Sequence, residues 1–294
     1  MESFFSFLEK RVDDCSSLLC VGLDPHVSDL SAPTAEAALD FSLNLVKQTA
    51  PYAAAFKPNA AFFEQFGAQG WTALKQVIEA IQEQSDRLGS MIPVILDAKR
   101  GDISSTAEAY AKAAFETLGA HCITLSPYLG KDSIDPFIGN SEKGVFLLCK
   151  TSNPGADDLQ NLLVTNDQQP TTDSSVLGHS SSVMTSPSFV PLYIHVAQLA
   201  QAWNTKNNIG LVVGATQPEA LIRVRAAAPS LWFLSPGVGA QGGDLEIALK
   251  AGLRKDGKGM LIPVSRGISR AARPALAAAE FRDEILNIKR NMKI

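Results

Sequence analysis

The sequence contains few of the residues that bind transition metals. Its 294 residues include four cysteines and four histidines. None of the cysteines forms a C-x-x-C pair, and the histidines show no paired spacing with each other or with cysteine. Such spacing is what a zinc site requires, so we expect no zinc or other transition-metal site. We interpret the cysteines as reduced structural thiols, because three of the four lie inside apolar runs.

The chain also lacks an excess of positive charge and long apolar runs. Its formal net charge is −4, so we expect no nucleic-acid partner, and an anion must bind at a local site. The first residues, MESFFSFLEKRVDDC, mix acids with apolar residues, unlike a secretory signal. No apolar run approaches the length of a membrane span. We therefore expect a cytoplasmic protein with no membrane partner.

What the sequence does contain is a regular series of short apolar runs. Hydrophobic residues make up 46% of the chain, enough for a large core. The runs do not alternate with polar residues, which is typical of strands buried on both faces. They begin at Leu18, Tyr52, Ile92, His121, Val145, Ile209, Leu231 and Met260.

Stretches with helical periodicity separate these runs. Leu39, Leu43 and Val46 follow the i, i+4, i+7 spacing of an amphipathic helix, for example. Eight strands alternating with helices predict a single (β/α)₈ barrel domain over residues 1–294, with a doubly wound open sheet as the alternative. Residues 156–188 are rich in Ser, Thr, Asp and Gln. We interpret them as an insertion after the fifth strand, either a surface excursion or a functional lid, and assign it no catalytic residue.

Polar and charged residues gather directly after the apolar runs, as in DPH, KPN, DAKRGD, KTSNPG and SRGI. In a barrel, the loops at the carboxyl ends of the strands converge on one face, where active sites are built. Turn formation accounts for the Pro, Gly and Asn in these segments, but not for so many Lys, Asp and Arg. The sequence therefore predicts a functional site at that face.

The segment VILDAKRGD places four charged residues after an apolar run. Residues two apart in a strand point the same way, so Asp97 and Lys99 should project together, with Lys57 beside them at the end of the second strand. A purely structural salt-bridge cluster is the alternative, but buried ion pairs stabilise proteins poorly, so function is favoured. Asp102 lies beyond the strand, where it could simply cap the following helix.

Two glycine-containing segments predict a phosphate site. SPGVGAQGGD follows the seventh run and SRGI follows the eighth, and these two loops often bind phosphate in barrel enzymes. Backbone N–H groups, the amide of Gln241 and the guanidinium of Arg266 could bind a phosphate dianion together. Asp24, Asn59, Thr151 and Ser152 at other strand ends suit a sugar and a base, although each could cap a helix.

Together these segments resemble a known family. LDAKRGDISSTAEAY, preceded by FKPN and followed by TSNPG, PGVGAQGGD and SRGI, is similar to the orotidine 5'-phosphate decarboxylase family, in particular its longer bacterial-type branch. The resemblance spans nearly the whole chain. It implies a homodimer of (β/α)₈ barrels with shared active sites, acting without metal or organic cofactor. The implied reaction converts orotidine 5'-phosphate to uridine 5'-phosphate, the last step of pyrimidine synthesis.

The resemblance also implies roles for individual residues. Lys57, Asp97 and Lys99 would form the charged array of one subunit, with Lys99 as the proton donor to C6 of the pyrimidine. Asp102 would reach into the neighbouring subunit's site. The implied substrate-binding residues are Thr106 and Asp24 for the ribose, Ser152 for the pyrimidine, and Gln241 and Arg266 for the phosphate.

Two other functions remain open at this point. A related barrel acting on a sugar phosphate, as a decarboxylase or aldolase, could reuse the Asp-x-Lys core and would require magnesium. A non-catalytic protein that binds a phosphate ligand is the second alternative. The combination of four charged residues argues against a non-catalytic protein, because a site without catalytic function has no reason to keep charges that are unfavourable to bury. These residues are Lys57, Asp97, Lys99 and Asp102.

Overall fold

The eight apolar runs form one parallel sheet of eight strands, in a computed structural model that describes residues 2–165, 189–238 and 242–293. Each strand lies within or beside its predicted run, and the barrel prediction is confirmed. The strands are β1 Leu19–Leu23, β2 Ala55–Pro58, β3 Ile95–Arg100, β4 Cys122–Leu125, β5 Gly144–Lys150, β8 Ile209–Val213, β9 Phe233–Leu234 and β10 Met260–Val264.

The sheet closes on itself between β2 and β3. Its strand order is β2-β1-β10-β9-β8-β5-β4-β3, and neighbours are paired in parallel ladders. The two end strands are joined by isolated bridges, Phe56 to Val94 and Asn59 to Asp97. The N–H of Ala60 also donates to the carbonyl of Asp97 at 3.1 Å. We call this junction of β2 and β3 the seam, and its closure makes the sheet a barrel rather than an open doubly wound sheet.

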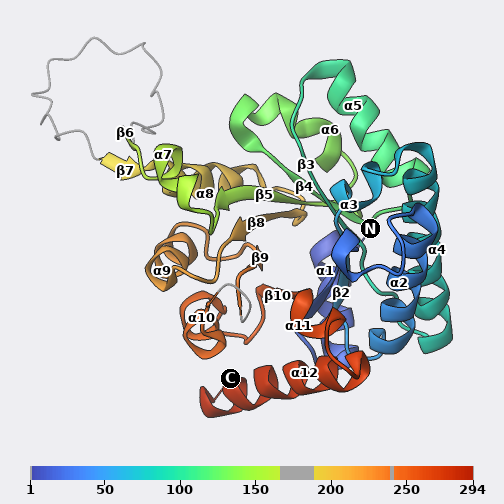
Figure 1. Cartoon of the computed structure of the whole chain (residues 1–294). Coiled ribbons are helices and arrows are strands. Elements are labelled where there is room, and N and C mark those ends of the chain that lie inside the picture. The colour runs from blue at the N-terminus through green and yellow to red at the C-terminus, as the bar shows by residue number, and fades with distance from the viewer. Residues whose placement is uncertain (1, 166–188, 239–241, 294) are drawn as a thin grey trace, which may run out of the picture.

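Helices surround the barrel (Figure 1). The predicted helix around Leu39 is α2 Ala35–Thr49, which buries Leu45 and Val46. The others are α1 Phe4–Cys15, α3 Ala61–Glu64, α4 Gly67–Leu88, α5 Ser104–Lys112, α6 Asp135–Ile138, α7 Asp157–Gln160, α8 Leu192–Trp203, α9 Pro218–Ala227, α10 Leu245–Gly252, α11 Arg266–Ser269 and α12 Pro274–Asn291. A π-helical turn, Ala113–Thr117, extends α5, and short 3₁₀ segments span Val27–Asp29, Pro127–Leu129, Lys131–Ser133 and Pro154–Ala156. None of the described helices is long and apolar enough to cross a membrane.

The amino-terminal helix α1 packs against the beginnings of the strands. The ring of Phe5 stacks on Trp232 with 6.1 Å between centroids and meets Phe146 edge to face at 5.6 Å. A Cβ atom at Gly144, the first residue of β5, would lie 2.2 Å from the ring of Phe4, so a side chain does not fit there. Helix α1 therefore covers the end of the barrel opposite the polar loops.

The beginning of the expected insertion has regular structure. Ala156 is buried, and α7 follows it directly. A two-stranded antiparallel sheet then pairs β6 Leu163–Thr165 with β7 Phe189–Pro191. Residues 166–188 lie outside the described residues. The insertion as a unit, with boundaries at 156 and 188, remains a prediction.

Candidate active site

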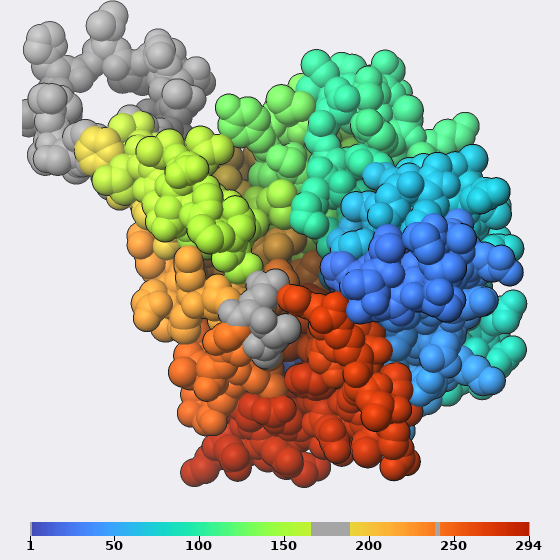
Figure 2. Space-filling view, in the orientation of Figure 1, coloured from blue at the N-terminus to red at the C-terminus, as the bar shows by residue number. Residues whose placement is uncertain are grey.

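A cavity of about 750 Å³ opens at the carboxyl ends of the barrel strands. Residues in or just after each of the eight strands contribute to its wall. Figure 2 shows segments from the first, middle and last parts of the chain meeting around this face. The polar strand ends singled out in the sequence thus surround one enclosed space.

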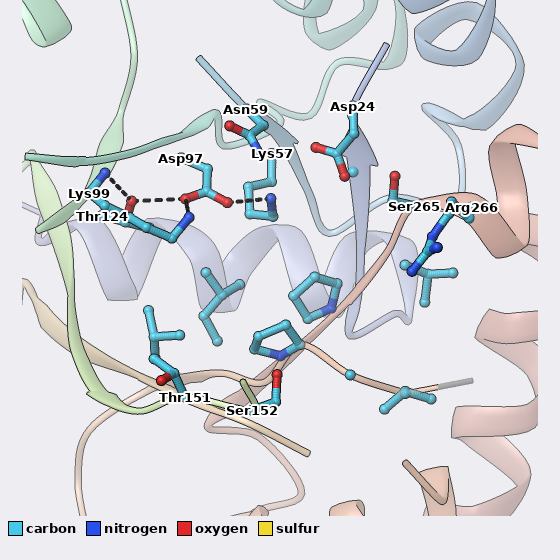
Figure 3. Close-up of a pocket in the computed structure, with 18 of the residues that line it drawn as sticks. Asp24, Lys57, Asn59, Asp97, Lys99, Thr124, Thr151, Ser152, Ser265 and Arg266 are labelled. Atoms are coloured by element: carbon cyan, nitrogen blue, oxygen red, sulfur yellow. Dashed lines mark hydrogen bonds and ion pairs between the residues drawn. The ribbon is translucent and has the colours of Figure 1, made fainter. Parts of the chain in front are cut away.

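Lys57, Asp97 and Lys99 meet at the base of this cavity and form what we call the charged array (Figure 3). Nζ of Lys57 lies 2.7 Å from Oδ2 of Asp97, and Nζ of Lys99 lies 2.5 Å from Oδ1. The side chains of Lys57 and Asp97 are 9% and 11% exposed, whereas that of Lys99 is 51% exposed. One buried carboxylate therefore binds two ammonium groups, and one of these faces the open cavity.

The environment keeps the buried pair charged. Burial disfavours the charged form of Lys57, but the nearby carboxylates of Asp97 and Asp24 outweigh it and raise the pKa of Lys57. Burial likewise opposes the charge on Asp97, but Lys57 and Lys99 hold the pKa of Asp97 well below its usual range. At neutral pH the site therefore contains a carboxylate between positive charges.

The backbone conformation of Lys99 differs from that of a regular strand. The register between β3 and β4 shifts between Leu96 and Arg100, and the φ of Lys99 is +48°. Asp97 and Lys99 project together as expected, but the strand between them is irregular and does not follow simple alternation. A β-bulge with a left-handed residue directs Lys99 toward Asp97.

Asp102 and Thr106 are not among the described residues that line this cavity. Oδ1 of Asp102 accepts a hydrogen bond from the N–H of Ile103 at 2.8 Å. The N-cap position of α5 belongs to Ile103 and has no side-chain cap, so Asp102 does not cap this helix in the usual way. Thr106 is exposed on the first turn of α5. Within one chain, therefore, neither residue reaches the charged array.

The predicted phosphate loops meet at one end of the cavity. Arg266 begins α11 and lines the cavity with residues of the loop after β9. Gln241 lies outside the described residues. The N–H of Gly243 donates to the carbonyl of Gly237 at 3.0 Å, so the two described sides of that loop lie together. Oγ of Ser265 is buried and has no hydrogen-bond partner among the described residues.

Asp24 and Ser152 also line the cavity. Figure 3 shows Asp24 near Ser265 and Arg266, and Thr151 and Ser152 on the other side of the pocket. Oδ1 of Asp24 is buried without a hydrogen-bond partner in the described part of the chain. A buried carboxylate oxygen of this kind suits a ligand hydroxyl, since an unpaired polar atom is costly.

Several lining residues were missed by sequence reasoning. Thr124 is the only hydroxyl-bearing residue in the apolar strand β4, a signal that was available. Gln160 lies in the expected insertion, yet its side chain accepts from the N–H of Thr151 at 2.9 Å and donates to Oγ1 of Thr151 at 2.8 Å. The rings of His26 and Phe62 pack together at 4.2 Å on the cavity wall, and no sequence pattern pairs them.

No group of three or more His, Cys, Asp or Glu side chains that could bind a metal ion occurs among the described residues. The four cysteines are buried and unpaired, and burial raises the pKa of Cys15 and Cys122. Lys57, Asp97 and Lys99 contact one another, so this part of the site can act on a ligand electrostatically.

Comparisons with known proteins show which family the chain belongs to. A sequence profile described as "Orotidine 5'-phosphate decarboxylase / HUMPS family" matches residues 17–281. An orotidine 5'-phosphate decarboxylase of Roseiflexus castenholzii is 42% identical, over 96% of this chain and 97% of the relative.

Two solved structures from Leishmania donovani are also similar. The structure of OMP decarboxylase is 51% identical and has a TM-score of 0.81, and the match covers 98% of each chain. The structure of UMP synthase is 52% identical with a TM-score of 0.83, over 98% of this chain and 57% of that chain. The chain thus spans little more than half the length of that second protein. The matched profile and these full-length similarities place the chain in the orotidine 5'-phosphate decarboxylase family.

Proposed function

We propose that this protein decarboxylates orotidine 5'-phosphate to uridine 5'-phosphate, the last step of de novo pyrimidine synthesis. The observation that carries the proposal is the charged array. Asp97 holds Lys57 and Lys99 at 2.7 Å and 2.5 Å inside a cavity that Arg266, a predicted phosphate-binding residue, also lines. A cavity of about 750 Å³ is large enough for a nucleotide.

The chemistry explains why such an array is useful. When the bond between C6 and the carboxylate breaks, carbon dioxide leaves and the electron pair stays on C6 as a poorly delocalised carbanion. The barrier is then set by charge, which preorganised ionic groups can stabilise. The ammonium of Lys99 would lie beside C6, stabilise the developing carbanion and transfer a proton to it. Solvent would return a proton to Lys99 after product release.

Asp97 and Lys57 would prepare Lys99 for this step. The carboxylate of Asp97 would face the substrate carboxylate and disfavour it. Lys57 neutralises the other oxygen of Asp97 from the buried side. With substrate bound, Lys99 would be fixed between the carbanion and Asp97.

Four residues would bind the rest of the substrate. Arg266, together with Gln241, would bind the phosphate, Asp24 the ribose hydroxyls and Ser152 the pyrimidine. The phosphate lies far from the bond that breaks, so its binding energy can be used to order the charged groups rather than only to hold substrate.

A homodimer would complete the site. Asp102 and Thr106 lie outside the cavity of their own chain, and apolar side chains in the loops after β3 and β4 are exposed. Ile103 is 48% exposed, Tyr128 81% and Leu129 48%. An exposed apolar patch of this kind suits a protein interface. We place Asp102 and Thr106 in the partner subunit's site, where Asp102 would join the array and Thr106 would contact the ribose.

The test is a decarboxylation assay in the presence of EDTA. Purified protein is mixed with orotidine 5'-phosphate, and loss of the pyrimidine carboxylate is followed by absorbance. We expect turnover in wild type, loss of turnover in Lys99→Ala, and normal turnover in Lys75→Ala, which removes a comparably exposed lysine from α4. No turnover by wild type, or full turnover by Lys99→Ala, would refute the proposal. Activity that appears only with added magnesium, on a sugar phosphate, would support the related barrel enzyme instead.

A further inference from the structure

Thr124 is the one residue of β4 that lines the cavity. Its hydroxyl contacts both Asp97 and Lys99 of β3. The residue is 1% exposed. Its Oγ1 lies 3.1 Å from Oδ1 of Asp97 and accepts hydrogen bonds from the N–H groups of Ala98 at 3.0 Å and Lys99 at 2.9 Å. A hydroxyl has one hydrogen to donate and two lone pairs to accept with, so these three contacts use it fully.

The two backbone contacts fall where the sheet is irregular. Pairing between β3 and β4 jumps from Leu96 with Ile123 to Arg100 with Leu125, so three residues of β3 lie opposite the single residue Thr124. A bulge of this kind interrupts the ladder, and buried N–H groups need another acceptor. The Thr124 hydroxyl is that acceptor for both Ala98 and Lys99.

The backbone of Lys99 depends on this support. Its φ of +48° lies in the left-handed region, which residues with a side chain rarely adopt unless the surroundings hold them there. The N–H that Thr124 binds is the N–H of this same residue. The third contact of the hydroxyl lies on the carboxylate oxygen that Lys99 also binds.

We propose that Thr124 is a positioning residue for Lys99 and Asp97. Its hydroxyl holds the bulge that turns Lys99 toward the cavity, and by donating to Oδ1 it fixes the plane of the Asp97 carboxylate between the two lysines. The inference rests on the proposed decarboxylase function for its kinetic consequence. Its structural part, the support of the Lys99 conformation, stands on the hydrogen bonds alone.

Thr124→Val tests the hydroxyl with little change in shape. The substitution leaves the part-buried N–H groups of Ala98 and Lys99 without their acceptor and removes the hydroxyl that contacts the Asp97 carboxylate. We expect kcat to fall by about 100-fold, since displacements of about 1 Å at a reacting group have this effect, while KM changes little. Thr124→Ser keeps the hydroxyl and should retain most of the wild-type kcat.

Thr49→Val is the matched control. Thr49 is also fully buried, but its Oγ1 donates to the carbonyl of Leu45 at 2.7 Å within α2, away from the cavity. The Thr49→Val protein should have a lower melting temperature than wild type but the same kcat. If Thr124→Val lowers kcat only through unfolding, both valine variants will show lower melting temperatures and equal specific activity per folded molecule, which overturns the proposal.

The remaining outcomes are equally decisive. Wild-type kcat in Thr124→Val overturns the inference, and equal losses in Thr124→Ser and Thr124→Val attribute the effect to packing and also overturn it. If wild type does not act on orotidine 5'-phosphate, the proposed function fails, and a crystal structure of Thr124→Val decides the inference separately. A positive φ retained at Lys99 contradicts it, and a change of that φ supports it.

Discussion

Lys99 and Asp102 are three residues apart, yet they face different surroundings. Nζ of Lys99 binds Asp97 in the cavity, whereas the carboxylate of Asp102 accepts from the N–H of Ile103 and is absent from the described cavity wall. If the site is shared between subunits, Lys99→Ala and Asp102→Ala should each be inactive. A mixed dimer of the two would contain one site with both substitutions and one with neither.

Mixing the two inactive variants should therefore restore activity, up to about a quarter of the wild-type rate when subunits exchange at random in a two-fold dimer. Each variant incubated alone provides the control, and mass spectrometry of differently tagged chains measures the exchange. Confirmed exchange without returning activity would assign Asp102 to its own chain and contradict the shared site.

Arg266→Ala should damage turnover as well as affinity. Arg266 lines the cavity at the start of α11, and phosphate binding there would order the charged groups at the other end. Initial rates over a range of substrate concentrations separate kcat from KM. Arg270→Ala is the control. It removes an exposed arginine that directly follows α11 and pairs with Asp29, and it should leave both constants unchanged. A raised KM with normal kcat would show that the phosphate contributes binding alone.

Asp97→Asn should destabilise the fold in addition to inactivating the site. The substitution leaves the ammonium of Lys57, 9% exposed, without its partner at 2.7 Å. Loss of one member of a buried pair costs about 3 kcal/mol, and replacing both members costs much less. Urea unfolding at pH 7 should show this loss, and Lys57→Met combined with Asp97→Asn should recover most of it. Asp135→Asn breaks an exposed pair with Lys131 and should change the free energy of unfolding by less than about 1 kcal/mol. Equal effects of Asp97→Asn and Asp135→Asn would contradict the expectation.

His121 should make the protein less stable in mild acid. Burial, with a smaller contribution from Lys143, lowers the pKa of His121 to about 4, and its Nδ1 accepts from the N–H of Val94 at 3.1 Å. Because the folded-state pKa lies below the usual value near 6.5, the unfolded chain binds the proton first as pH falls. The free energy of unfolding should therefore fall by about 3 kcal/mol between pH 7 and pH 4 through this group. His121→Asn should flatten that part of a stability curve measured by urea unfolding. An unchanged slope would show that other groups control it.

The strands and the charged residues of the site could be predicted because their signals are local. A strand buried on both faces needs a continuous apolar run, and β1 and β8 are buried at every position. Lys57 and Asp97 were found because charge at the end of such a run is poorly explained by stability, since a buried ion pair stabilises a fold little. The barrel then brings all strand ends to one face, so location along the chain was enough to group them.

Other parts of the site depend on contacts between distant segments. The left-handed conformation of Lys99 follows from the register of β3 against β4, which no local pattern encodes. Gln160 belongs to the four-residue helix α7, which is too short to show a period, so the residue was assigned to an insertion. Its contacts with Thr151, nine residues earlier, exist only once the loop has folded.

The charged array lies at the seam of the barrel, so it also links the two strands that close the sheet. Other neighbouring strands of the barrel are joined by ladders, whereas β2 and β3 are joined by isolated bridges, and the pair of Lys57 with Asp97 crosses between them. The junction that closes the barrel and the proposed reacting centre thus lie in the same place. Regions with few hydrogen bonds open at lower free energy than the rest of a fold. Gentle heating should therefore open the barrel between these two strands and abolish the proposed activity, while the remaining ladders still join all eight strands in one sheet.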